Sequence, residues 1–200
     1  MTTPFEYPAA HHQRRHGPRG YTDYTGYRPW LRDEFTFRCV YCLQRERWIP
    51  PAAALEIDHF LPVALNPELA TEYDNLLYCC STCNTAKRTR LLPDPTVVLL
   101  GETVRVDPDG TIHPLTPEAE RLVIGLGLDS ATYTEFRLLW IGIVAMAGRH
   151  APDLHLRLIG FPADLPDLAA LRPPGGNTRP GGIAASYFRQ RERGELPTTY

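Results

Sequence analysis

Four of the five cysteines occur as two C-x-x-C pairs, Cys39 with Cys42 and Cys80 with Cys83. Two such pairs separated by a few tens of residues have the spacing of a structural zinc site, in which each pair supplies two thiolate ligands. Cys79 could replace Cys80 as a ligand, but three residues would then separate it from Cys83. We therefore predict a four-cysteine zinc site and assign Cys79 to packing.

An acid, a histidine and two asparagines accompany these pairs: Asp58, His59, Asn75 and Asn84. Singly, each has an ordinary structural explanation, such as a hydrogen-bonded Asp-His pair, a turn or a helix cap. Together they match the needs of metal-assisted phosphodiester hydrolysis. Asp58 and Asn84 offer oxygen ligands suited to Mg²⁺ or Mn²⁺, and a histidine can accept a proton from water near neutral pH. Asn75 could hold the imidazole or the loop that carries it.

Positive charge follows the second cysteine pair directly, at Lys87, Arg88 and Arg90. We predict that these side chains bind nucleic acid, because they would lie where its phosphates pass the site. The formal net charge is −2, so any such binding must come from a local patch and not from the field of the whole chain. Two more basic clusters, at residues 11–16 and 189–193, have a solvated tail or face as their ordinary explanation.

Local patterns indicate the elements that would position these residues. Residues 55–60 alternate as a strand does, which places Asp58 and His59 on opposite faces. The two side chains can serve one site only if the strand bends or ends near His59, and Pro62 favours such an end. Two further elements are expected, a strand over residues 75–78 and a helix that Ser81 or Thr82 caps and that runs through Arg90.

The order and spacing of these motifs resemble those of the HNH endonuclease family, in the zinc-stapled branch of the ββα-metal nucleases. The resemblance covers roughly residues 27–92, less than half of the chain. It rests on four blocks: Cys39-Val-Tyr-Cys42, Asp58-His59-Phe-Leu-Pro62, Asn75-Leu76 and Cys80-Ser-Thr-Cys83-Asn84-Thr-Ala-Lys87. It implies an α+β fold with a small ββα-metal core and a structural zinc ion.

The resemblance also implies a role for each polar residue. His59 would act as the general base, Asp58 and Asn84 would hold one divalent ion, and Asn75 would steady the base. The substrate would be DNA, expected to be double-stranded, and the products would carry 5′-phosphate ends. Many family members have histidine where Asn84 stands, and asparagine there favours a hard ion such as Mg²⁺.

Composition divides the chain into four parts. We expect a flexible basic and histidine-rich arm over residues 1–26, the nuclease module over 27–92, a hairpin with helices packed on the module over 93–172, and a Pro/Gly-rich linker with a terminal helix over 173–200. The other expected helices lie within residues 27–37, 116–126, 130–148, 154–158 and 184–193. The other expected strands lie at residues 45–50, 96–100, 103–106 and 111–113.

The composition, 43% hydrophobic and 22% charged, is typical of a soluble folded protein. The longest apolar run, residues 138–147, is about half of what a bilayer span needs, so we expect no membrane segment. We expect that run to be buried, either in this protein or against a protein partner of the C-terminal helices. The cysteine pattern favours a reducing compartment and predicts a cytoplasmic location. The alternative function is a zinc-stapled module that binds nucleic acid or protein without catalysis.

Overall fold

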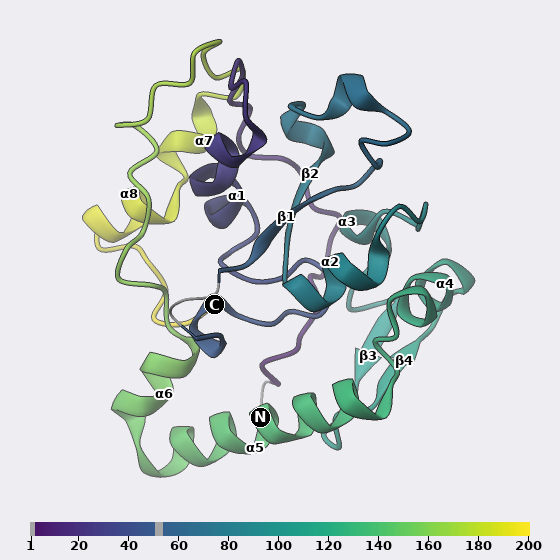
Figure 1. Ribbon diagram of the computed structural model, residues 1–200. Coiled ribbons are helices and arrows are strands. Elements are labelled where there is room, and N and C mark those ends of the chain that lie inside the picture. The colour runs from purple at the N-terminus through teal and green to yellow at the C-terminus, as the bar shows by residue number, and fades with distance from the viewer. Residues whose placement is uncertain (1–2, 51–53) are drawn as a thin grey trace.

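The computed structural model describes residues 3–50 and 54–200, so residues 1 and 2 of the predicted arm and residues 51–53 of the predicted module lie outside it. At its centre, an antiparallel pair of strands, β1 (Glu56–His59) and β2 (Leu76–Cys79), is followed by helix α2 (Ser81–Lys87), as Figure 1 shows. In this pair, Asp58 lies opposite Leu77. Small sheets mixed with helices confirm the predicted α+β class.

Helix α2 is shorter than predicted. It begins after Cys80, whose sulfur accepts a hydrogen bond from the backbone N–H of Cys83, so neither Ser81 nor Thr82 is the cap. It ends at Lys87 because Arg88 adopts a φ of +50°, outside the right-handed helical region. The arginines that follow therefore lie on an irregular segment and not on the helix.

Helix α1 (Arg28–Glu34) packs against β2, and Pro29 occupies its first turn as predicted. Trp30 and Leu31 of this helix are fully buried, and all four residues of β2 are buried as well. Apolar residues of helix α4 (Pro117–Leu126) belong to the same core cluster. One core thus joins the central strands to elements far along the chain.

The segment that we expected to form a flexible arm is packed against the rest of the protein. Glu34 accepts hydrogen bonds from His12 Nε2 (2.9 Å), Arg15 N (2.8 Å) and His16 N (3.0 Å). Burial raises the pKa of the Glu34 carboxyl, but these partners outweigh it and lower that pKa to about 2. The apolar residues Phe5 and Tyr7 are also buried. Local composition missed this docking, because it depends on carboxylates that the arm meets only in the folded chain.

Residues beyond 93 form the predicted hairpin, β3 (Val104–Val106) paired with β4 (Ile112–Pro114). Two predicted strands are wrong. Residues 96–100 fall mainly in helix α3 (Pro95–Val98), because Asp94 caps it and Pro95 fits its first turn. Residues 45–50 contain a 3₁₀ helix at Glu46–Trp48. The other 3₁₀ helices described are Tyr24–Tyr27, Pro67–Leu69 and Tyr73–Asn75.

The longest helix, α5 (Ala131–His150), begins at the predicted cap Ser130 and runs along the edge of the molecule (Figure 1). Trp140 of α5 stacks on Trp48 with ring centroids 4.4 Å apart, which fixes the helix to the module. The chain continues through α6 (Pro152–Ile159), α7 (Gly181–Ala184) and α8 (Tyr187–Glu192). The predicted terminal helix is thus broken at Ser186, which caps α8. Among the described residues, no helix combines the length and apolar character needed to cross a membrane.

Candidate metal centre and active site

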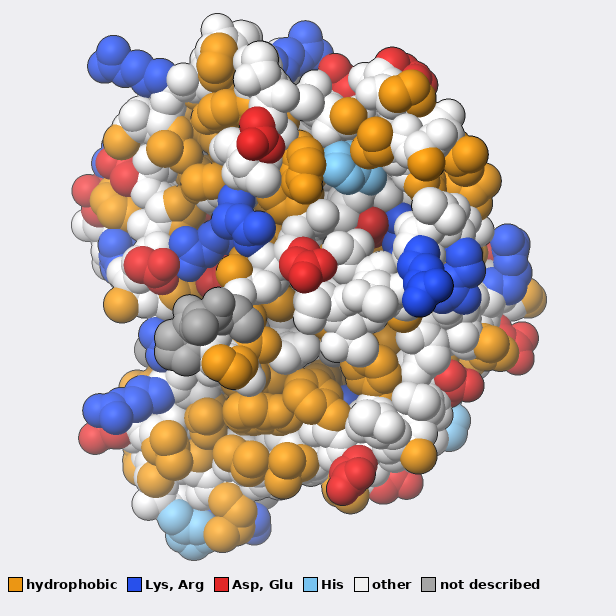
Figure 2. Space-filling view, in the orientation of Figure 1, with side chains coloured by type: hydrophobic (Ala, Val, Ile, Leu, Met, Phe, Trp, Pro, Cys, Tyr) orange, Lys and Arg blue, Asp and Glu red, His pale blue; other side chains and the backbone are white. Residues whose placement is uncertain are grey.

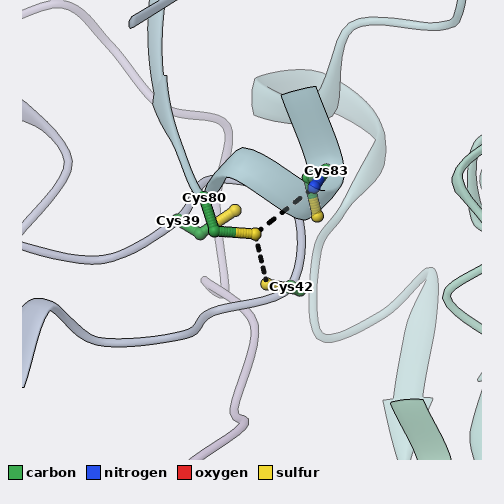
Figure 3. Close-up of side chains that lie close together, drawn as sticks. All are labelled: Cys39, Cys42, Cys80 and Cys83. Atoms are coloured by element: carbon green, nitrogen blue, oxygen red, sulfur yellow. Dashed lines mark hydrogen bonds between the residues drawn. The ribbon is translucent and has the colours of Figure 1, made fainter. Parts of the chain in front are cut away.

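The four predicted zinc ligands converge at one buried point. The sulfurs of Cys39, Cys42, Cys80 and Cys83 all lie within 4.8 Å of one another (Figure 3). Cys42 Sγ and Cys80 Sγ are 3.7 Å apart. A tetrahedral zinc with Zn–S bonds of about 2.3 Å needs a sulfur–sulfur separation of about 3.8 Å. The donor set and the spacing therefore fit zinc, and the predicted convergence of the four cysteines is confirmed.

Residues outside the cysteine pairs support this cluster. Tyr133 of α5 lies with its hydroxyl 3.2 Å from Cys83 Sγ, and it would donate to the thiolate when zinc is bound. Cys79 is fully buried in the core and does not belong to the four-sulfur cluster, which agrees with its assignment to packing. A supporting tyrosine fifty residues away could not be found from the spacing of the cysteines.

Asp58 faces α2, and both of its carboxylate oxygens have partners. Lys87 Nζ donates to Oδ1 at 3.0 Å, and the hydroxyl of Tyr41 donates to Oδ2 at 2.6 Å. Burial raises the pKa of the Asp58 carboxyl, and the Lys87 ammonium opposes that rise. Burial also raises the pKa of Tyr41, which keeps its hydroxyl protonated as a donor. A carboxylate has about four lone-pair positions, so these two hydrogen bonds leave lone pairs of Asp58 unused.

The prediction that Lys87 binds nucleic acid must be corrected. Its side chain is only 1% exposed, and its ammonium also donates to the backbone carbonyl of His59 at 2.7 Å. The cause is the helical spacing, because α2 directs Lys87 inward onto β1. Arg88 and Arg90 are exposed, so only these two of the three predicted residues can meet phosphates here. Basic side chains on the face in Figure 2 lie in several small groups and not in one patch.

Replacing Lys87 with methionine should destabilise the protein by about 3–5 kcal/mol, because it leaves the buried Asp58 carboxylate without its charge partner. Arg88→Met, one residue further on, should change stability by less than about 0.5 kcal/mol because that side chain is exposed. Urea unfolding of the two zinc-loaded variants provides the measurement. Equal stabilities would contradict a structural role for Lys87.

Asn84 lies on α2 as predicted, and its amide is bound to a residue that the sequence did not single out. Asn84 Nδ2 donates to Glu56 Oε2 at 2.6 Å. Glu56 stands two residues before Asp58, so strand alternation puts both acids on the face of β1 toward α2. That alternation was visible in the sequence and could have identified Glu56. Two carboxylates and one amide therefore lie along the junction of β1 and α2.

His59 ends β1, and its ring is held by the loop that follows. Its Nε2 lies 2.9 Å from the backbone oxygen of Ala70. A carbonyl oxygen can only accept, so Nε2 is the donor, and in the neutral tautomer that this contact selects the lone pair lies on Nδ1. The ring of Tyr24 packs edge-to-face on the imidazole, with centroids 4.8 Å apart. His59 is thus oriented by two residues that sequence reasoning missed, and it is half-buried.

Asn75 holds the loop between the two strands, and its described hydrogen bonds do not include the imidazole. Its Oδ1 accepts from Leu61 N at 2.8 Å, and its Nδ2 donates to Leu61 O at 3.1 Å and to Leu69 O at 3.3 Å. Leu69 directly precedes Ala70, whose carbonyl orients His59. Of the two roles expected for Asn75, the structure shows the contacts needed for holding the loop.

The structure gathers the predicted residues into two groups. Asp58 and Asn84 lie on the junction of β1 and α2, whereas the His59 ring turns to the loop after β1. The sequence required the strand either to bend or to end near His59, and β1 ends at that residue. The link between the groups in this structure is Lys87, which donates both to Asp58 and to the His59 carbonyl.

The module consists of two strands and a helix beside a cluster of four cysteines. An acid, a histidine and amides lie where the strands meet the helix, and this arrangement is of the ββα-metal type. Residues 39–90 match the family model described as HNH endonuclease, which confirms the predicted resemblance over this segment. The match indicates nuclease-type activity on nucleic acid. Comparison of the chain with curated proteins and with solved structures gave no match.

Proposed function

We propose that this protein is a metal-dependent DNA endonuclease that hydrolyses phosphodiester bonds in double-stranded DNA and leaves 5′-phosphate ends. The observation that carries the proposal is the orientation of His59. Because Nε2 donates to the Ala70 carbonyl, Nδ1 is left as a proton acceptor on a half-buried ring at the end of β1. A fixed acceptor of this kind is what a general base requires.

The residues along β1 and α2 suit a hard divalent ion, Mg²⁺ or Mn²⁺. Asp58 and Asn84 would supply a carboxylate and an amide oxygen, and Glu56 offers a second carboxylate beside Asn84. When bound, the ion would polarise the scissile phosphate and stabilise the leaving 3′-oxygen. Asn75 would keep the loop, and through it the Ala70 carbonyl, in place while His59 removes a proton from the attacking water.

Residues beside the proposed active site would bind the DNA and hold the domain together. Arg88 and Arg90, both exposed beyond the end of α2, would contact DNA phosphates. The zinc would hold the two cysteine-bearing segments together and take no part in the chemistry. The all-thiolate ligand set favours a reducing compartment, which supports a location in the cytoplasm.

One observation favours a second candidate function. The Lys87 ammonium sits on the Asp58 carboxylate, where it supplies the positive charge that a divalent ion would otherwise provide. A module stabilised in this way could bind nucleic acid without cutting it. Incubation of the zinc-loaded protein with duplex DNA and Mg²⁺ or Mn²⁺ separates the two candidates. Cleavage products that a ligase can rejoin without prior phosphorylation support the endonuclease.

A further inference from the structure

Helix α5 presents an apolar face to solvent on the side opposite its buried residues. Leu139 is 59% exposed, Met146 is 54% exposed and Leu138 is 49% exposed, whereas Val144 and Ala147 of the same helix are buried. The exposed side chains of Leu138, Leu139 and Met146 line an apolar groove together with Leu154 of α6. Figure 2 shows hydrophobic side chains gathered over the lower part of the molecule, where Figure 1 places α5. The sequence predicted a covered surface here, and the described residues of this chain do not cover it.

The exposed face of α5 has a pattern that is symmetrical about Gly142. Glu135 and Arg149 stand seven residues to either side, and Leu138 and Met146 stand four residues to either side. Seven residues come within about 20° of two full turns, so Glu135, Gly142 and Arg149 share one face of the helix. Apart from the backbone of its own helix, a Cβ atom at Gly142 would meet no described atom within 4 Å, so that position is open to close approach by another helix.

We propose that this face binds a second copy of the same chain, with the two α5 helices antiparallel and a two-fold axis passing beside Gly142. In that arrangement Leu138 of each copy packs against Met146 of the other. Leu138 and Met146 of the two copies together form an apolar stripe. Glu135 of each copy also faces Arg149 of the other, so opposite charges meet at both ends of this stripe. A two-fold interface requires a surface that is complementary to itself when it is turned end over end, and this face of α5 meets that requirement.

The charges at the ends of the stripe are available for such pairing. Glu135 and Arg149 are both exposed, and neither forms an ion pair with another described residue. Arg149 instead rests on the sulfur of Met146, at 3.4 Å. In Figure 1, α5 lies on the edge away from the loop that joins β1 to β2, so pairing would leave both candidate active sites uncovered. The dimer would therefore carry two nuclease modules.

Sedimentation equilibrium of the zinc-loaded full chain tests this proposal. The wild type should sediment as a dimer of twice its 22.6 kDa mass. Met146→Glu should make it monomeric, because the substitution buries charge in the stripe. The matched control is Ile124→Glu on α4, which replaces another apolar residue that is 59% exposed but lies outside the stripe. This control should leave the dimer intact, and circular dichroism and zinc content should be the same in all variants.

Charge reversal tests the antiparallel register itself. Glu135→Arg or Arg149→Glu alone places like charges at both ends of the stripe and should raise the dimer dissociation constant about tenfold or more. The double variant E135R/R149E restores opposite charges and should return to the wild-type value. A monomeric wild type at every concentration would overturn the proposal. So would a dimer that Met146→Glu leaves unchanged, or one in which the double variant is no tighter than the single variants.

Discussion

The zinc-loaded His59→Ala variant should cleave DNA about 10²- to 10⁴-fold more slowly than the wild type, with its fold and zinc content unchanged. The size of the loss is that of a general base in proton transfer from water. His59 stands at the end of β1 and its ring contacts Ala70 and Tyr24, so truncation removes few packing contacts. Single-turnover cleavage of a labelled duplex at saturating Mg²⁺ gives the rate.

His113 provides a matched control for this prediction. It lies on the hairpin, is 40% exposed and pairs with Asp107, far along the chain from the family match. His113→Ala should cleave at the wild-type rate, which separates the loss of a base from a general effect of removing a histidine. A His59→Ala protein that still cleaves DNA at the wild-type rate would contradict the role of His59 as general base.

Replacing Cys80 with serine should abolish folding of the HNH segment at 25 °C. Zinc binding to such a site supplies about 10–16 kcal/mol, which is comparable to the whole stability of a typical domain, about 5–15 kcal/mol. Cys80 carries a further role, because its sulfur caps α2 and lies 3.7 Å from Cys42 Sγ. Far-ultraviolet circular dichroism and the zinc content of the purified protein are the measurements.

Cys79→Ala is the control, since it removes the neighbouring cysteine, which is also buried but lies outside the sulfur cluster. That variant should keep one zinc per chain and lose no more than about 1–2 kcal/mol through the small cavity it creates. If Cys79→Ala lost zinc and Cys80→Ser retained it, Cys79 would be the zinc ligand and Cys80 the packing residue.

The sequence was informative where a short motif fixes its own geometry. The cysteine pairs predicted the sulfur cluster, the turn residues between 106 and 112 predicted the hairpin, and Ser130 predicted the start of α5. In each case neighbours in the chain decide the outcome, through ligand spacing, turn chemistry or a helix cap.

The sequence was less informative where the position of a side chain depends on a partner distant in the chain. The sequence predicts a phosphate contact at Lys87 because it shows the charge of that residue, whereas the burial of Lys87 depends on Asp58, twenty-nine residues earlier in the chain. The docking of the N-terminal arm depends in the same way on Glu34. The carbonyl of Ala70 cannot be anticipated from residue type, because any residue in that loop position supplies the same acceptor.

The dependence of DNA cleavage on divalent ions, measured with the zinc-loaded wild-type protein, tests the proposed function most directly. Plasmid DNA should be nicked or linearised when Mg²⁺ or Mn²⁺ is added, and it should stay supercoiled when only the structural zinc is present. Plasmid that stays intact with every ion, while the same protein retards duplex DNA in a gel, would contradict the endonuclease and establish a binding module.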